Sequence, residues 1–133
     1  MSDKAFLDTN VLIYAIAKDD PRRSRAEELL AAGGVISVQV LNEFVSVARR
    51  KLHMSWEEVI EVLDAIRVLC PSAVPITPDS HESALKIAQQ YGYGIYDALI
   101  VAAALGAKCS TLYSEDLQDG QIIGRLTIRN PFR

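Results

Sequence analysis

The chain has 133 residues, a length that suits one folded domain and allows a substantial hydrophobic core. Half of the residues are hydrophobic and 23% are charged, which excludes an intrinsically disordered protein. The longest apolar run, residues 98–107, has about half of the ~20 residues that cross a bilayer, so we expect no membrane segment. No signal-peptide pattern opens the chain, and Cys70 and Cys109 form no metal motif. We therefore expect reduced thiols in the cytoplasm.

The net charge is −3, from 14 basic and 17 acidic residues. This balance argues against a general nucleic-acid-binding protein, which is usually basic. If several acids gather in one site, however, the rest of the surface is close to neutral. The positions of the acids therefore matter more than their number.

The predicted elements alternate between short apolar strands and helices. We expect strands at residues 5–7, 35–37, 109–113 and 126–128, and a weaker extended piece at 74–76 that contains a proline. We expect helices at residues 11–17, 20–32, 38–52, 55–70, 77–92 and 97–106, several of them with capping residues at their starts. Strands that alternate with helices predict an α/β fold with a mostly parallel sheet covered on both faces. In such sheets ligands bind beyond the carboxyl ends of the strands.

Four carboxylates lack the basic neighbours that would explain them. Asp8 and Asp116 follow predicted apolar strands, Glu43 lies in a helix without a basic residue three or four positions away, and Asp97 precedes an apolar run. Each has an ordinary structural explanation as well: Asp8 and Asp97 can cap helices, Glu43 can be solvated, and Asp116 can belong to a turn. Thr9 or Asn10 could cap the first helix instead and leave Asp8 free for a cation.

Taken together, the four carboxylates predict a cation site. Carboxylates that converge in one cleft repel one another unless a positive charge lies among them. Oxygen ligands without His or Cys at ligand spacing favour Mg²⁺ or Mn²⁺ over zinc. A water on such an ion can attack a phosphodiester, and two such ions can clamp its oxygens; one ion and two ions both remain open.

Four segments carry a resemblance to a known family. They are FLDTNVLIY (residues 6–14), LNEF (41–44), YDALIVAAA (96–104) and LYSEDLQDG (112–120). In this order and at this spacing they resemble the PIN-domain ribonucleases, in particular the VapC-type toxins of toxin–antitoxin pairs. The first two segments are weak signals by themselves, whereas the four in sequence are specific.

The resemblance implies a three-layer α/β/α sandwich formed by residues 1–133 as one domain. It implies an endoribonuclease dependent on Mg²⁺ or Mn²⁺, a small antitoxin partner and a homodimer. The catalytic and metal-binding carboxylates that it implies are Asp8, Glu43, Asp97 and Asp116. Asp8 and Asp97 would be the most direct metal ligands, and Asn10 would orient Asp8. Asp119 is a possible extra carboxylate outside this set.

RNA also needs positive partners. Arg22 and Arg23 lie at the start of a predicted helix, where cations are unfavourable, so we expect them to contact phosphates or the protein partner. Arg49, Arg50 and Lys51 end another helix, where cations are favourable without any ligand.

Two other functions remain open on the sequence. A phosphohydrolase of the haloacid-dehalogenase type would use Asp8 as its nucleophile, but that family has Asp-x-Asp where this chain has Asn10 in the third place. A non-catalytic module of the same fold would bind RNA or protein without cleaving it. Metal-dependent RNA cleavage separates these alternatives from a nuclease.

Overall fold

A computed structural model describes residues 4–133 of the chain, which form six helices and six short strands within this range. The strands are β1 (Ala5–Leu7), β2 (Ile36–Ser37), β3 (Ala73–Val74), β4 (Thr111–Tyr113), β5 (Ile122–Ile123) and β6 (Leu126–Arg129). The helices are α1 (Thr9–Ile16), α2 (Arg23–Ala31), α3 (Val38–Arg50), α4 (Trp56–Leu69), α5 (Pro78–Tyr91) and α6 (Ile95–Gly106). Over the part of the chain described, no helix is long and apolar enough to span a membrane.

The strands form a mostly parallel arrangement. A four-stranded sheet has the order β1-β4-β6-β5, and β2 pairs with β3 in a second, two-stranded sheet. All pairings are parallel except that of β5 with β6. A parallel bridge between Phe6 and Val35 joins the two sheets. The carboxyl ends of β1, β2 and β4 therefore lie on the same edge, which is where parallel sheets place their ligands.

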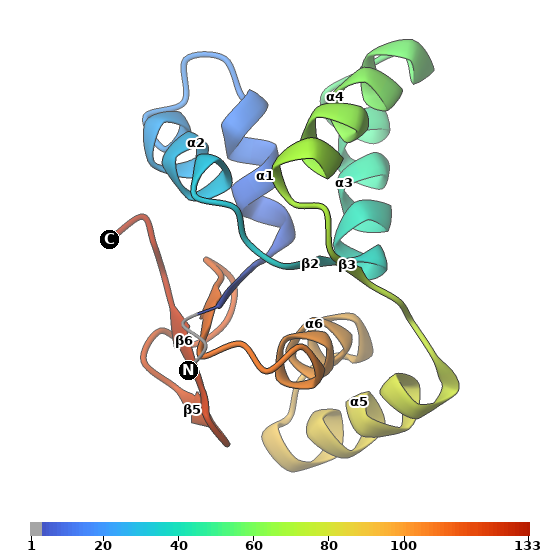
Figure 1. The fold of residues 1–133 in the computed structure, drawn as a ribbon, viewed down its shortest axis with the longest axis vertical. Helices are drawn as coiled ribbons and strands as arrows, with labels where there is room; N and C mark the ends of the chain where they lie inside the picture. The colour runs from blue at the N-terminus through green and yellow to red at the C-terminus, as the bar shows by residue number, and fades with distance from the viewer. Residues whose placement is uncertain (1–3) are drawn as a thin grey trace.

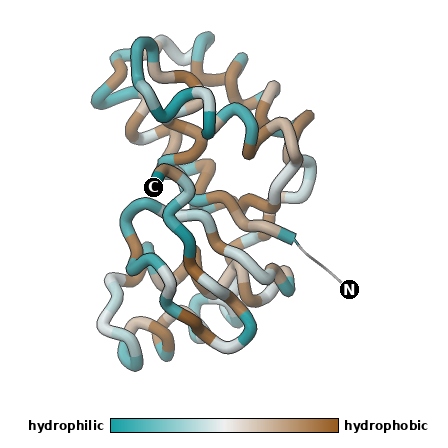
Figure 2. The backbone as a smooth tube through the Cα atoms, turned by 90° about the vertical axis from the view of Figure 1, so that its left-hand side faces the viewer, coloured by the Kyte–Doolittle hydropathy of each residue, from teal (hydrophilic) through white to brown (hydrophobic). Residues whose placement is uncertain are grey.

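The helices cover both faces of the strands, as expected for a three-layer α/β/α sandwich. Figure 1 shows α1 to α4 on one side of the strands and α5 and α6 on the other. In Figure 2 the helical tubes alternate between hydrophobic and hydrophilic stretches, which is typical of helices that bury one face. Helix α6 differs, because seven of its twelve residues are buried.

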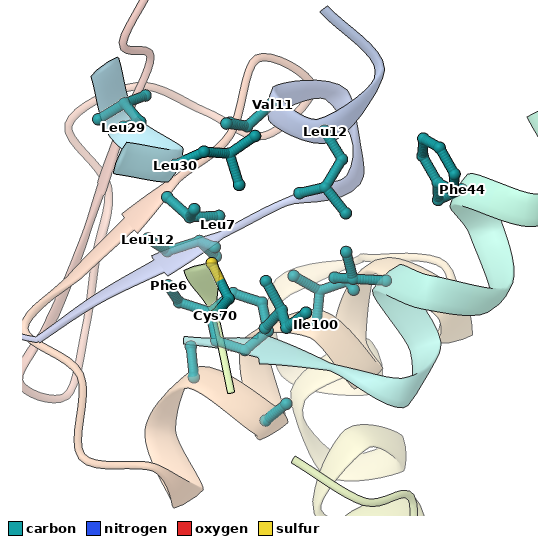
Figure 3. Close-up of a cluster of buried hydrophobic side chains, with 14 of the residues drawn as sticks. Phe6, Leu7, Val11, Leu12, Leu29, Leu30, Phe44, Cys70, Ile100 and Leu112 are labelled. Carbon is teal, nitrogen blue, oxygen red and sulfur yellow. The ribbon is translucent and has the colours of Figure 1, made fainter. Parts of the chain in front are cut away.

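The core lies around β1, whose side chains alternate between the two helical layers. Leu7 faces Leu30 of α2, whereas Phe6 lies toward Ile100 of α6 (Figure 3). Both strand residues are buried, with exposures of 1% and 0%. This alternation follows from the two-residue repeat of a strand. It fixes β1 between the layers, so that the residue after it, Asp8, emerges at the edge of the sheet.

Capping residues set most helix starts as predicted. Ser55 forms a capping box with Glu58 at the start of α4, and Thr77 forms one with Ser80 before Pro78 in α5. Gly92 ends α5 with a positive φ of 74°, which glycine adopts without strain.

The structure differs from the sequence prediction at several element boundaries and adds one strand. Helix α1 begins at Thr9 rather than residue 11, because Asp8 caps it. Helix α2 begins at Arg23, after a turn in which Asp20 accepts the backbone N–H of Arg22. Strand β3 ends before Pro75, and β4 begins only at Thr111. The two-residue strand β5 was not predicted.

Candidate active site

Asp8 is the most buried of the four candidate carboxylates, with 4% of its surface exposed. The backbone N–H of Thr9 donates to its Oδ1 at 2.7 Å, and the Ser114 hydroxyl donates to its Oδ2 at 2.7 Å. Asp8 is thus the N-cap of α1, which is one of the two alternatives that the sequence left open, and neither Thr9 nor Asn10 caps this helix. Burial raises the pKa of Asp8 to about 6, and the charges of Glu43 and Asp116 add to this rise against the two hydrogen bonds.

Glu43 lies on α3, which begins directly after β2 because Ser37 caps it. Its two carboxylate oxygens accept hydrogen bonds from neutral donors: the Thr9 hydroxyl at 3.1 Å and the Gln39 amide at 2.8 Å. Gln39 lies one turn earlier on the same helix, and 7% of its surface is exposed. Thr9 therefore joins the end of β1 to α3 through the side chain of Glu43.

Asp116 follows β4 in the loop 114–119 and is exposed. The Asn10 amide donates to its Oδ2 at 2.9 Å. Asn10 was expected to orient Asp8, and this expectation is wrong: its side chain holds Asp116. The reason is helical geometry, since Asn10 lies one position into α1 and faces the loop after β4 rather than back along β1.

Asp97 lies in the first turn of α6 rather than at its N-cap. Gly94 caps this helix through its backbone alone, so the expectation that Asp97 opens the helix is wrong. Burial raises the pKa of Asp97, and the nearby charge of Asp116 raises it further. The Asp97 side chain makes no hydrogen bond or ion pair with another residue in the range 4–133.

The four carboxylates lie at one edge of the fold but do not form a closed metal cage. Glu43 and Asp116 line one cavity of about 250 Å³; the charges of both raise the pKa of Asp8, and the charge of Asp116 raises that of Asp97. None of the four pairs with a Lys or Arg among the residues described. In the same range, no three Asp, Glu, His or Cys side chains are clustered tightly enough to hold a metal ion as they stand. Three of the four carboxylates accept hydrogen bonds from neutral donors instead, which are Thr9 and Ser114 for Asp8, Thr9 and Gln39 for Glu43, and Asn10 for Asp116.

The donor set fits a hard divalent cation. All available ligand atoms are oxygens, which suit Mg²⁺ and Mn²⁺. Asp8 is buried and pairs with no Lys or Arg among the residues described, so burial raises its pKa and its ionised form has no compensating positive charge there. A bound cation would supply that charge.

This cavity is shared by three elements, and we call it the acidic cavity. Its walls come from α1, α3 and the loop after β4: Thr9, Asn10, Glu43, Ser46, Val47, Arg50 and Asp116. Of the larger hollows, one lies at the opposite end of the strands and one has mostly apolar walls. The acidic cavity brings two of the four candidate carboxylates together with polar donors.

Asp119 and Arg22 have structural partners. Asp119 accepts the backbone N–H of Asn130 at 2.8 Å and lies 3.7 Å from Arg133, so it holds the C-terminal segment. The Arg22 guanidinium bonds both oxygens of Asp20 and reaches Glu115 at 3.1 Å. Arg22 thus ties the start of α2 to the loop that carries Asp116.

Sequence reasoning missed three polar residues of the site: Thr9, Gln39 and Ser114. Ser114 is fully buried and follows β4 directly, so its place beside Asp8 follows from the parallel pairing of β1 with β4. Gln39 could have been found from its spacing, four residues before Glu43.

The comparison with protein-family models decides the family. The model of the PIN domain matches residues 5–118. The chain belongs to the PIN-domain family. VapC-type toxins of this family are generally endoribonucleases, and PIN-domain nucleases generally use divalent metals. No curated protein sequence is significantly similar to the chain.

Solved structures of toxin–antitoxin proteins share this PIN fold. A toxin–antitoxin complex from Klebsiella pneumoniae matches with a TM-score of 0.73 and 24% identity, over 97% of this chain and 98% of that one. VapBC2 from Rickettsia felis, bound to a DNA fragment from its promoter, matches with a TM-score of 0.66 and 24% identity, over 94% and 96%. VapC20 from Mycobacterium tuberculosis, a toxin that cleaves the sarcin–ricin loop, matches with a TM-score of 0.68 and 21% identity, over 85% and 90%.

Proposed function

We propose that this PIN domain is an endoribonuclease that depends on Mg²⁺ or Mn²⁺. The observation that carries the proposal is the set of four carboxylates at one edge of the sheet, none of which pairs with a cation within residues 4–133. Family membership supports the same conclusion, since VapC-type toxins of this family are generally endoribonucleases.

The four carboxylates would bind the metal with different degrees of directness. Asp8 and Asp97 would be the most direct ligands, and Glu43 and Asp116 would complete the set. The bound ion would acidify a water molecule and stabilise negative charge on the phosphate oxygens. Hydrogen bonds from neighbouring residues hold these carboxylates in position. Ser114 and Thr9 donate to Asp8, Gln39 and Thr9 donate to Glu43, and Asn10 donates to Asp116.

A cleavage assay with a matched pair of variants tests this proposal. We expect the wild-type chain to cleave RNA with Mg²⁺ or Mn²⁺ and not with EDTA. Asp97→Asn should lower the rate by more than about 100-fold, because it removes a metal ligand. Asp119→Asn lies in the same family motif but bonds the C-terminal segment, so it should keep the activity. Intact RNA with folded wild-type protein and either metal would refute the nuclease and favour a binding module.

We further propose that the chain is the toxin of a toxin–antitoxin pair and forms a homodimer in the cytoplasm. The support is the similarity of its fold to toxin–antitoxin complexes from two bacteria. Co-expression with the product of a short neighbouring reading frame should yield a complex in which RNA cleavage is suppressed. Light scattering of the isolated chain should give the mass of a dimer, and cell fractionation should place it in the cytoplasm.

We also propose that residues 1–133 fold as one domain. Helices α1 to α4 and the α5–α6 pair pack on strands that share the central β1–β4 pairing (Figure 1). Calorimetry should therefore show one unfolding transition, and two separate transitions would contradict the proposal.

A further inference from the structure

Arg50 is the cationic residue in the wall of the acidic cavity. It lies on α3 seven residues after Glu43, which is two helical turns and therefore the same face of the helix. Across the cavity, Asp116 belongs to the loop after β4. The cavity thus has carboxylates on two walls and a guanidinium at one end.

The Arg50 side chain is turned toward the carboxylates. Its Nε donates to the Ser46 hydroxyl at 3.0 Å, one turn closer to Glu43. Side chains on a helix lean toward its N-terminus, so this bond extends the guanidinium back along α3. Its terminal NH₂ groups make no hydrogen bond or ion pair with any residue in the range 4–133. Donors remain available at the cavity for a ligand.

The neighbouring cations on α3 have other surroundings. Arg49 donates to the carbonyl oxygen of Met54 at 2.7 Å, and its guanidinium lies 4.4 Å from the centre of the Trp56 ring. Lys51 is the C-cap residue and does not line the cavity. The favourable effect of cations at the end of a helix applies to this whole group, but it does not explain why Arg50 alone of the three lines the acidic cavity.

We propose that Arg50 binds a phosphate group of the RNA backbone at the acidic cavity. This inference rests on the proposed nuclease function. A phosphate that approaches four carboxylates is repelled, and a metal ion can offset only part of that charge. A guanidinium offers two parallel N–H donors that match two phosphate oxygens, and Ser46 holds the Arg50 side chain in place for that contact.

Cleavage kinetics of three variants test the proposal, with a fluorogenic single-stranded RNA of mixed sequence and Mn²⁺. Arg50→Gln should lower kcat/KM by about 10- to 100-fold, mainly through KM, because a charge-assisted hydrogen bond to the substrate is lost. The dependence of log(kcat/KM) on log[salt] should become shallower by about 0.7, the value for one phosphate contact on a single strand. Arg50→Lys should recover part of the loss. Lys51→Gln removes the same charge one residue away and should change neither quantity.

The possible results distinguish a failure of the Arg50–phosphate contact from a failure of the proposed nuclease function. Wild-type cleavage with equal kinetics for Arg50→Gln and Lys51→Gln would overturn the phosphate contact and leave the nuclease intact. An effect on kcat with an unchanged salt slope would also overturn it. If the wild-type chain leaves RNA intact, the nuclease proposal fails. Filter binding of the same RNA then tests the phosphate contact by itself, and equal affinities of wild type and Arg50→Gln for the RNA would refute it. Thermal melting of every variant verifies that it is folded.

Discussion

Asp8 makes the free energy of unfolding depend on pH in an unusual direction. Burial raises its pKa from 3.8 to about 6, so the folded state binds a proton more tightly than the unfolded chain does. Well below pH 4 Asp8 is protonated in both the folded and the unfolded state, so its raised pKa does not lower the free energy of unfolding. As the pH rises from about 4 to about 6, the unfolded chain ionises first and the folded state loses stability. A shift of about two units corresponds to at most about 3 kcal/mol, which is fully lost above pH 6.

Asp8→Asn should recover this energy in the metal-free protein. The asparagine oxygen can still accept the Thr9 N–H, and its amide can donate to the Ser114 hydroxyl. With EDTA at pH 8, we expect the variant to be more stable than wild type by about 1–3 kcal/mol. Near pH 4 the difference should disappear. Urea denaturation at a series of pH values measures both quantities.

An exposed carboxylate provides the control for this experiment. Asp64 lies on the surface of α4, 3.6 Å from Arg67, and Asp64→Asn should change stability by less than about 0.5 kcal/mol at either pH. Addition of Mn²⁺ should stabilise wild type more than Asp8→Asn, because only wild type would offer the metal all four proposed carboxylate ligands. If the stability of Asp8→Asn relative to wild type is the same at pH 4 and at pH 8, the ionised Asp8 carboxylate does not destabilise the folded state and the reasoning is wrong.

Three further changes probe the site and its frame. Asp97→Asn should leave the melting temperature in EDTA unchanged or slightly higher, because burial already disfavours the ionised form of Asp97; a marked fall in a melting curve would contradict this. Tyr14→Phe removes the hydroxyl that donates to Glu115 and should cost about 1 kcal/mol in urea denaturation, whereas an unchanged midpoint would show the bond to be dispensable. Gly34→Ala places a Cβ 2.6 Å from the Leu7 side chain and should cost about 1–3 kcal/mol by the same measurement, unless Leu7 can move aside.

The sequence predicted most helices well, because the residues that start and end a helix lie close to its ends in the chain. A capping serine or threonine, a proline in the first turn and a glycine at the end act within a few residues, as in α4 and α5. The start of α6 shows the limit of this reasoning. Aspartate is a residue type that often caps helices, but here the helix already begins at Ile95, and Gly94 occupies the N-cap position before Asp97. Strand β5 was missed because two residues carry no periodicity, and its pairing with β6 depends on the turn between them.

The carboxylates of the site could be singled out from the sequence, whereas their partners could not. The surroundings of Asp8 and Glu43 in the chain lack basic residues, and this signal is local. The partner of Asn10 lies 106 residues away, so only the pairing of β1 with β4 reveals it. Arg22 shows the same limit, because its ion pair with Glu115 also depends on the folded arrangement. Its position at a helix start suggested a ligand, but an internal partner accounts for its charge.

The parallel pairing of β1 with β4 also has a consequence during protein synthesis. Residues 5–7 are synthesised about a hundred residues before their neighbours in the sheet, residues 111–113. Asp8 and Asp116 therefore stay apart until that later segment has been made. A nascent chain that stops before residue 111 cannot form this pairing, so it cannot bring Asp8 and Asp116 together.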